Sequence, residues 1–163
     1  MRHLTATICL AVALLLGSAG VSWSQDFQKG VAAYKSGDYA TALREWTPLA
    51  KEGNTPAQFN LGNMYRQGQG VPQDYKTALK WYKLAAEQGD ADAQYNLGLR
   101  YAFGKGVLKD YVYAHMWGNV AAMNGNELGA KLRDDFEKKM TPADISTAQK
   151  LARECVRKNY KGC

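Results

Sequence analysis

Apolar side chains in this chain recur at helical spacing, in short segments that end at glycine. Asp74 is a good N-cap residue, and one apolar helix face follows it and ends before Gly89: Tyr75, Ala78, Tyr82, Ala85 and Ala86. Asp90 caps a second segment, whose apolar face ends before Gly104: Ala93, Leu97, Gly98 and Tyr101. The pattern predicts two helices joined by a tight turn.

The same pattern returns every 36 residues, and an aspartate–tyrosine pair begins each copy, at Asp38, Asp74 and Asp110. Small residues share the same phase: Ala42, Ala78 and Ala114, and Gly53, Gly89 and Gly125. A fixed period of this length is typical of a solenoid, in which each unit buries its apolar face only against its neighbours. We therefore predict these segments: a signal peptide (1–24), an N-terminal helix (25–37), repeat one (38–73), repeat two (74–109), a degenerate third repeat (110–140), and a capping helix and tail (141–163).

Glycines inside the predicted helices indicate close packing. Gly62 and Gly98 share a phase and cost about 1 kcal/mol each relative to alanine, so their recurrence predicts that a neighbouring helix needs the space. Trp81 and Trp117 also share a phase, whereas the first unit has its tryptophan, Trp46, one position later. We expect Trp81 and Trp117 to pack in the core rather than to line a ligand cage.

The third copy is incomplete. After Gly125 the Leu-Gly-x-x-Tyr signature is missing, and we predict a charged helix over Leu128–Lys139. Thr141 followed by Pro142 is typical of a helix start, and one apolar stripe follows: Ile145, Ala148, Leu151, Ala152 and Cys155. A solenoid needs such a segment to cover its last unit.

Three motifs follow one another from the second copy into the third. They are Ala-x-x-x-Leu-Gly-x-x-Tyr at Ala93–Tyr101, Gly-x-Gly-Val-x-x-Asp-Tyr at Gly104–Tyr111, and an Ala-Ala-x-x-Gly ending within Ala114–Gly125. Together they resemble the Sel-one-like repeat, a relative of the tetratricopeptide repeat, and the resemblance covers roughly Asp38 to Gly125. It implies an all-α fold: a short right-handed α-solenoid of helix-turn-helix repeats, closed by a C-terminal capping helix pair like that of short secreted members.

The N-terminus has the features of a secretion signal: a charged start at Arg2, an apolar run over Ile8–Leu16, and small residues around Ser24. We predict cleavage after Ser24, with Gly20 as the second choice. The apolar run is too short to cross a bilayer as a helix, so no transmembrane segment is expected after cleavage. The predicted location is periplasmic or secreted.

Cleavage leaves two cysteines, Cys155 and Cys163, and lowers the formal net charge of +6 by the one charge of Arg2. In an oxidising compartment the two thiols are natural partners, because the tail after the last helix can fold back on its final turn. We expect an intrachain disulfide. An intermolecular bridge and free thiols remain the alternatives.

The sequence argues against an enzyme. The mature chain has one histidine, His115, so a two-histidine metal site is excluded, and we expect His115 to be an ordinary helix residue. Ser-x-x-Lys does not occur, and Ser36 and Ser146 have no nucleophile-elbow context. The glycine loops at 68–70 and 104–106 lack the third glycine and the preceding strand of a phosphate-binding loop. No cofactor and no metal are predicted, and an envelope hydrolase is the least favoured function.

The predicted function is a non-catalytic protein–protein interaction module of a bacterial-type cell envelope, which holds a peptide or a helix of its partner on a concave face. Asn60 and Asn96 share a phase, and amides on the inner face of related repeats bind extended peptides. Arg66 and Arg100 are weighed with them. The alternative is that these four side chains support the helix turns or face solvent.

The final helix offers a second kind of partner. Basic side chains fall at helical spacing on the side away from its apolar stripe: Lys150, Arg153, Arg157 and Lys161. Most basic faces are simply solvated, but this one predicts, as an alternative function, binding to an anionic envelope polymer or a lipid surface. Nucleic acid is not expected, because the chain is exported and has no aromatic platform among its basic residues.

Overall fold

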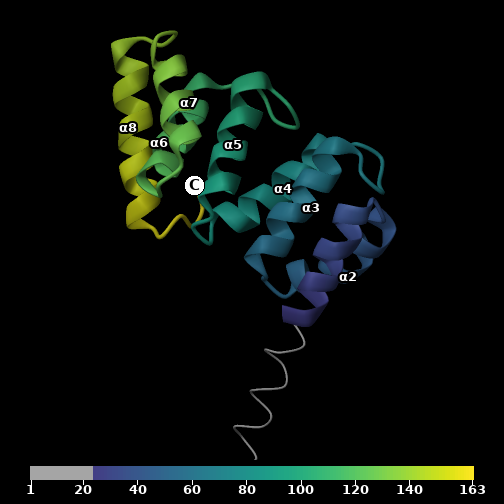
Figure 1. Cartoon of the computed structure of the whole chain (residues 1–163). Helices are drawn as coiled ribbons and strands as arrows, with labels where there is room; N and C mark the ends of the chain where they lie inside the picture. Colours follow the sequence, from purple (N-terminus) through teal and green to yellow (C-terminus); the bar gives the residue numbers. More distant parts are fainter. Residues whose placement is uncertain (1–23) are drawn as a thin grey trace, which may run out of the picture.

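The computed structural model describes residues 24–163, and every regular element in that range is a helix. A first helix over residues 24–36 is followed by seven more (Figure 1): α2 (Tyr39–Lys51), α3 (Thr55–Gln67), α4 (Tyr75–Ala86), α5 (Ala91–Phe103), α6 (Tyr111–Met123), α7 (Glu127–Glu137) and α8 (Pro142–Arg157). The predicted signal peptide lies outside the described residues, apart from its last position.

The 36-residue period sets where the helices begin. Side chains at two recurring positions cap the helix starts: Asp38, Asp74 and Asp110 before α2, α4 and α6, and Asn54, Asp90 and Asn126 before α3, α5 and α7. Each accepts a hydrogen bond from a backbone N–H in the first turn, which satisfies one of the donors left unpaired at a helix start. Gly68 and Gly104 end α3 and α5 in the left-handed conformation, with φ of 71° and 64°. The predicted helix starts at Asp74, Asp90 and Thr141 are confirmed.

Each helix from α2 to α6 packs on the one that follows it, and α8 returns to pack on α6. Figure 1 shows the resulting stack of antiparallel helices, with α8 lying along the outside of the last pair. Because contacts run mainly between neighbours, the core is divided along the stack. One part surrounds Trp46, a second surrounds Tyr82 and Trp117, and a third surrounds Leu132 and Phe136. The predicted α-solenoid with terminal capping helices is confirmed.

The helical glycines make room for rings, as the sequence predicts. A Cβ on Gly30 would clash with the indole of Trp46, and a Cβ on Gly62 would lie 2.7 Å from the ring of Tyr82. Tyr82 is thus the structural counterpart of Trp46 in the next unit, which explains why the tryptophan of the first unit stands one position out of phase. Trp117 is only 2% exposed and belongs to the core, as expected.

In the third unit a different side chain fills the space beside the helical glycine. Gly118 stands where Tyr82 stands in the unit before, so no ring of α6 covers Gly98. Leu132 of α7 fills that space instead: its Cδ2 would lie 2.6 Å from a Cβ on Gly98. Gly118 and Gly129 let α6 and α7 approach closely, since a Cβ on Gly129 would lie 2.9 Å from the Gly118 carbonyl oxygen. The missing signature of the third copy therefore reflects a terminal helix, α7, that packs more tightly than a repeat helix.

A ladder of buried amides joins successive units. Gln58 Nε2 donates to the Ala50 carbonyl at 3.0 Å, and Gln88 Nε2 donates to Gln58 Oε1 at 2.7 Å. One period later Gln94 and Asn124 repeat the arrangement, at 3.2 and 2.8 Å. These bonds satisfy polar groups that would otherwise be buried unpaired.

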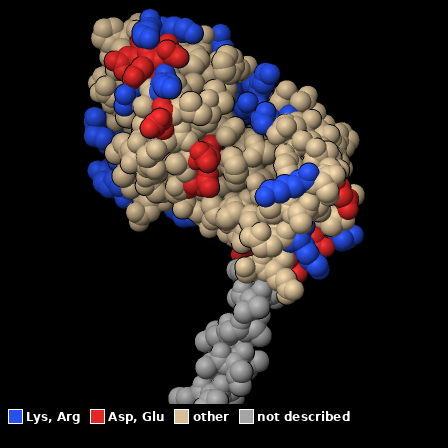
Figure 2. All heavy atoms as spheres, viewed as in Figure 1, with Lys and Arg blue, Asp and Glu red and all other residues tan. Residues whose placement is uncertain are grey.

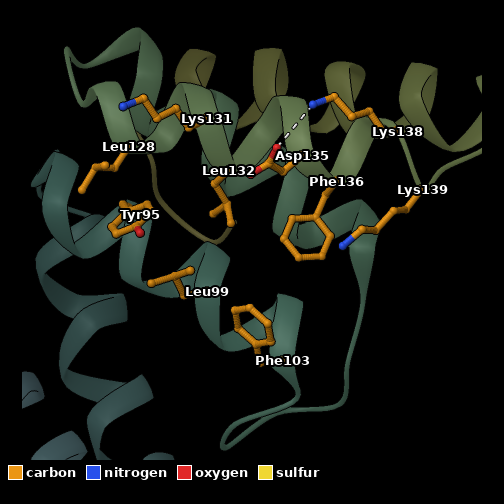
Figure 3. Close-up of a pocket in the computed structure, with 10 residues that line it drawn as sticks. All are labelled: Tyr95, Leu99, Phe103, Leu128, Lys131, Leu132, Asp135, Phe136, Lys138 and Lys139. Atoms are coloured by element: carbon orange, nitrogen blue, oxygen red, sulfur yellow. Dashed lines mark hydrogen bonds and ion pairs between the residues drawn. The ribbon is translucent and has the colours of Figure 1, made fainter.

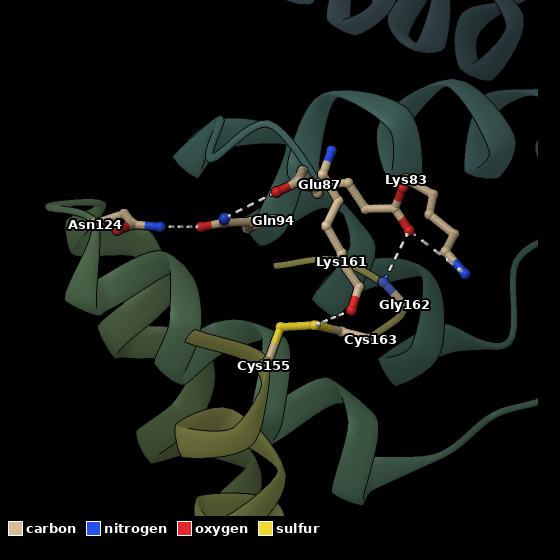
Figure 4. Close-up of a disulfide and its surroundings, with 9 residues drawn as sticks. Lys83, Glu87, Gln94, Asn124, Cys155, Lys161, Gly162 and Cys163 are labelled. Atoms are coloured by element: carbon tan, nitrogen blue, oxygen red, sulfur yellow. Dashed lines mark hydrogen bonds and ion pairs between the residues drawn. A yellow bond between two sulfur atoms is a disulfide. The ribbon is translucent and has the colours of Figure 1, made fainter. Parts of the chain in front are cut away.

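The C-terminal tail closes this ladder. The Tyr160 hydroxyl donates to Asn124 Oδ1 at 2.8 Å, from a residue held in the left-handed conformation at φ 64°. Cys155 and Cys163 are joined by a disulfide with their Cα atoms 5.5 Å apart, and the Gly162 N–H lies 3.4 Å from Glu87 Oε1 at the end of α4 (Figure 4). The tail thus contacts a unit far back in the sequence.

Candidate protein-binding surface

A groove of about 450 Å³ opens between α5 and α7 (Figure 3). Its α5 wall is one apolar stripe with a spacing of four residues: Tyr95, Leu99 and Phe103. The α7 wall carries Leu128, Leu132 and Phe136. Two of these apolar side chains remain largely in solvent, Phe103 at 61% and Leu128 at 51% exposed, so the groove presents apolar area that no part of the described chain covers.

Basic side chains surround this apolar floor. Lys131, Lys138 and Lys139 line the groove with a single acidic residue, Asp135. Lys138 pairs with Asp135 at 3.4 Å, and Lys139 Nζ lies 4.7 Å from the centre of the Phe136 ring. The rim therefore has an excess of positive charge.

Arg100 lies about 100° round α5 from Leu99, and only 7% of its surface is exposed. Its guanidinium stands 5.5 Å from the centre of the Tyr75 ring, the geometry of a cation–π contact. Nε and Nη1 are buried and donate no hydrogen bond. Burial lowers the pKa of Arg100, and the nearby positive charge of Arg66 acts in the same direction.

Arg66, in the last turn of α3, belongs to the same group. It is half-buried, and its Nε is buried without a hydrogen-bond partner. Both arginines lie near the phenol of Tyr82: burial raises the pKa of Tyr82, and the charges of Arg66 and Arg100 oppose that rise. The Tyr82 hydroxyl itself donates to Asn63 Oδ1 at 2.8 Å. Two predicted binding residues are thus brought together, at the junction of α3, α4 and α5.

The two asparagines differ from each other. Asn96 donates its amide to the Asp92 carbonyl of its own helix at 2.8 Å, the supporting role that the sequence leaves open as an alternative. Asn60 is half-buried, and its side-chain amide makes no hydrogen bond to the described residues. Whether either amide holds a peptide stays a prediction.

The basic residues of α8 lie together on the surface. Lys150, Arg153 and Arg157 line a shallow depression of about 280 Å³, which also contains Glu154. Figure 2 shows basic side chains along the edge of the molecule where α8 lies. Three of the four predicted basic residues therefore lie together, with Glu154 among them, whereas Lys161 lies in the tail after the end of α8.

His115 is fully buried rather than exposed, and its Nε2 lies 3.2 Å from Glu137 Oε2. This contact joins α6 to α7, and the Nδ1 of His115 is buried without a hydrogen-bond partner. Within residues 24–163, no group of three or more His, Cys, Asp or Glu side chains is arranged to hold a metal ion. None of the helices in that range combines the length and the apolar character needed to cross a membrane.

The groove between α5 and α7 was not predicted from the sequence. The Tyr95–Leu99–Phe103 stripe can be recognised in the sequence, but its spacing is that of any buried helix face. Only the position of α7, whose sequence departs from the repeat, shows that the stripe borders an open groove. The one sequence signal that could have indicated it is Leu128, an apolar residue at the start of the predicted charged helix.

Comparison with known proteins gives this geometry a family. The Sel1 repeat family model matches residues 55–90 and 91–126, so each matched repeat begins at α3 or α5, half a unit after the aspartate–tyrosine pairs. No curated protein matches the chain.

Two solved structures are similar to it. One is a protective antigen present in uropathogenic Escherichia coli strains, displaying an SLR fold: it is 34% identical, with a TM-score of 0.80 over 85% of this chain and 30% of that chain. The other is a Sel1 repeat protein from Oxalobacter formigenes, 30% identical, with a TM-score of 0.65 over 78% of this chain and 54% of that chain. This chain therefore spans less than two thirds of either relative. The chain therefore contains two Sel1 repeats, at residues 55–90 and 91–126, within a helical solenoid of the tetratricopeptide-like kind that both solved structures share.

Proposed function

We propose that this protein is a non-enzymatic scaffold that binds an apolar segment of a partner protein in the groove between α5 and α7. Sel1 repeat proteins generally mediate protein–protein interactions. The observation that carries the proposal is the exposed apolar lining of this groove, with Phe103 and Leu128 more than half exposed. An open apolar strip between two helices fits the apolar face of a helix or of an extended peptide.

The proposed location is the periplasm or the extracellular space. The signal-like N-terminus supports it, and so does the disulfide, since such bonds persist in oxidising compartments. N-terminal sequencing of the protein from fractionated cells tests this directly. A mature chain that begins near Gln25 or Val21 is expected, and a cytoplasmic protein that retains Met1 contradicts the proposal.

Selection from a random peptide library tests the groove. Peptides enriched on the purified protein should bind through apolar side chains, and Phe103→Asp or Leu128→Asp should weaken them at least about tenfold, because a charge would face the apolar ligand. Leu108→Asp is the matched control: Leu108 is 88% exposed and lies outside the groove. Fluorescence anisotropy with labelled peptides gives the dissociation constants.

Two results contradict the groove as the binding site. The first is that no peptide is enriched over an unrelated helical protein. The second is that enriched peptides bind the Phe103 and Leu128 variants as tightly as they bind the unchanged protein and the Leu108→Asp control.

A second candidate is an anionic partner on α8, supported by the depression that Lys150, Arg153 and Arg157 share. Sedimentation with vesicles of phosphatidylglycerol, against phosphatidylcholine vesicles, tests it. Binding should require the anionic lipid and be lost when the three residues are changed to glutamate. It should also fall with salt, because exposed charges are screened over about 8 Å at physiological ionic strength. Equal binding to both vesicles contradicts this candidate.

A further inference from the structure

We propose that Arg66 and Arg100 form a carboxylate-binding site that receives an aspartate or glutamate side chain of the partner protein. The proposal rests on the proposed function in one respect: the carboxylate belongs to the same partner that occupies the groove. The site itself is argued from the two guanidinium groups and their surroundings.

The first observation is that a buried charge lacks a counter-ion. Arginines as buried as Arg100 are almost never unpaired, because removing a charge from water is costly unless an opposite charge or hydrogen bonds replace the water. Yet none of the ion pairs among the described residues includes Arg100 or Arg66. Three nitrogens, Nε and Nη1 of Arg100 and Nε of Arg66, are buried without an acceptor.

The second observation is that the charges gather. Arg66 and Arg100 influence each other electrostatically and both act on Tyr82. Lys105 adds a third positive group, since its Nζ lies 5.2 Å from the centre of the same Tyr75 ring that Arg100 contacts at 5.5 Å. The like charges of Arg66 and Arg100 repel each other, and an anion beside both would relieve that repulsion.

A carboxylate fits this arrangement in chemical terms. The guanidinium group presents its donors in a planar fork that matches the two oxygens of a carboxylate, and such charge-assisted bonds are among the strongest in proteins. Tyr75 fixes the orientation of Arg100, so little freedom is lost when an anion binds. Arg66 is only half-buried, so the ligand can approach from its side.

The position of Arg100 links this site to the groove. Arg100 follows Leu99 of the groove stripe, about 100° further round α5. A partner segment that places apolar side chains beside Leu99 and then crosses α5 reaches the arginine pair. An acidic side chain at that point of the segment would bind there. The basic rim of the groove, with Lys131, Lys138 and Lys139 against Asp135, favours the same acidic partner.

Nuclear magnetic resonance can observe the site without the partner. The probe is glutamate blocked as N-acetylglutamate amide, which carries only a side-chain carboxylate, and the readout is the Nε–Hε signals of Arg66 and Arg100. We expect both signals to shift and to saturate. The corresponding glutamine amide, which has the same shape without the charge, should leave them in place.

Variants assign the effect to the pair. Arg100→Gln should raise the apparent dissociation constant seen at the Arg66 signal at least about tenfold, and Arg66→Gln should do the same at the Arg100 signal. The matched control is Arg153→Gln on α8, which removes one positive charge away from the site and should change the constant less than about twofold. Backbone spectra of each variant verify that it is folded.

Three outcomes overturn the assignment. One is that neither arginine signal shifts. Another is that N-acetylalanine, which carries only a terminal carboxylate, binds more tightly than the blocked glutamate, since the ligand would then be a chain terminus. The third is that inorganic phosphate alone produces the shifts. These results are independent of the peptide selection: if selected peptides require Phe103 while the arginines stay silent, only the carboxylate site fails.

Discussion

Arg100 shows how a single residue can oppose the stability of the fold. Leaving buried donors unpaired costs on the order of 1–3 kcal/mol, whereas a cation–π contact such as that with Tyr75 contributes about 0.5–2 kcal/mol. Because the two terms are of similar size, we expect Arg100 to contribute little net stability to the fold. This is the balance expected of a binding residue rather than a structural one.

Arg100→Met should therefore leave the free energy of unfolding unchanged or raise it by up to about 1 kcal/mol, since methionine fills a similar space without a charge. Urea denaturation measures the effect. Arg157→Met, at an exposed position of α8, is the control and should change the stability by less than about 0.5 kcal/mol. A loss above about 1 kcal/mol only in the Arg100 variant would show that its contacts support the fold.

Gly98 is a residue whose absent side chain matters. Gly98→Leu should lower the free energy of unfolding by about 1–3 kcal/mol, because the new side chain meets Leu132 and the Ala114 carbonyl oxygen, 2.6 and 3.2 Å from its Cβ. Calorimetry measures the loss. Combining Gly98→Leu with Leu132→Ala should cost less than the sum of the two single changes, because the smaller side chain vacates the space. Strict additivity would mean that the two residues do not compete for the same site.

At the scale of the helix, the repeated caps respond to pH in opposite directions. The Asp74 carboxylate accepts bonds from the Thr77 hydroxyl at 2.6 Å and from the backbone N–H groups of Lys76 and Thr77, and these bonds lower its pKa. Burial instead raises the pKa of Asp90. A group whose pKa is lowered on folding stabilises the fold above its unfolded pKa, about 3.9 for aspartate, and loses this effect as the pH falls through its folded pKa.

The melting temperature of Asp74→Ala should therefore fall below that of the unchanged protein at pH 7, and the difference should shrink near about pH 3. For Asp90→Ala the sign is reversed: protonation favours the folded state, so the difference should not shrink as the pH falls. Thermal unfolding of both variants at the two pH values measures this. Equal behaviour of the two variants would contradict the opposite environments of the two caps.

At the scale of the whole molecule, the tail joins units that are distant in sequence. Tyr160 bonds to Asn124 and packs near Gly89, while Gly162 reaches Glu87. Each unit of a solenoid contacts only the units next to it, so no further repeat covers the last unit. The last unit therefore needs a closing segment such as this tail. The disulfide between Cys155 and Cys163 holds the tail in this position.

Replacing both cysteines with serine should lower the free energy of unfolding by about 2–3 kcal/mol, from the loop-closure entropy of a ring this short. Tyr160→Phe, which keeps the ring and loses only the hydroxyl, should cost about 1 kcal/mol. Mass mapping without reductant should find the two cysteines linked within a monomer. Two alkylatable thiols, or a disulfide found only in dimers, would contradict the pairing.

The helices and their order could be read from the sequence because they depend on local interactions. Caps such as Asp74 and Asp90, the apolar phase of each helix and the glycine stops all act within one or two turns. The 36-residue period then restricts the stack to neighbouring contacts. The shared phase of Asn60 and Asn96 drew attention to the nearby Arg66 and Arg100 as candidates, although it could not show that the two arginines meet.

Only the tertiary structure decided where the groove opens and which charged side chains are buried. Leu132 covers Gly98 only because α7 packs closely on α6, and the same packing opens the groove beside Phe103. Whether a guanidinium is buried and unpaired depends on every element around it, so Arg100 became a candidate anion site only once α3, α4 and α5 were placed together. Local sequence determines where helices start and stop, whereas desolvation and the shape of a groove are properties of faces that meet across the fold.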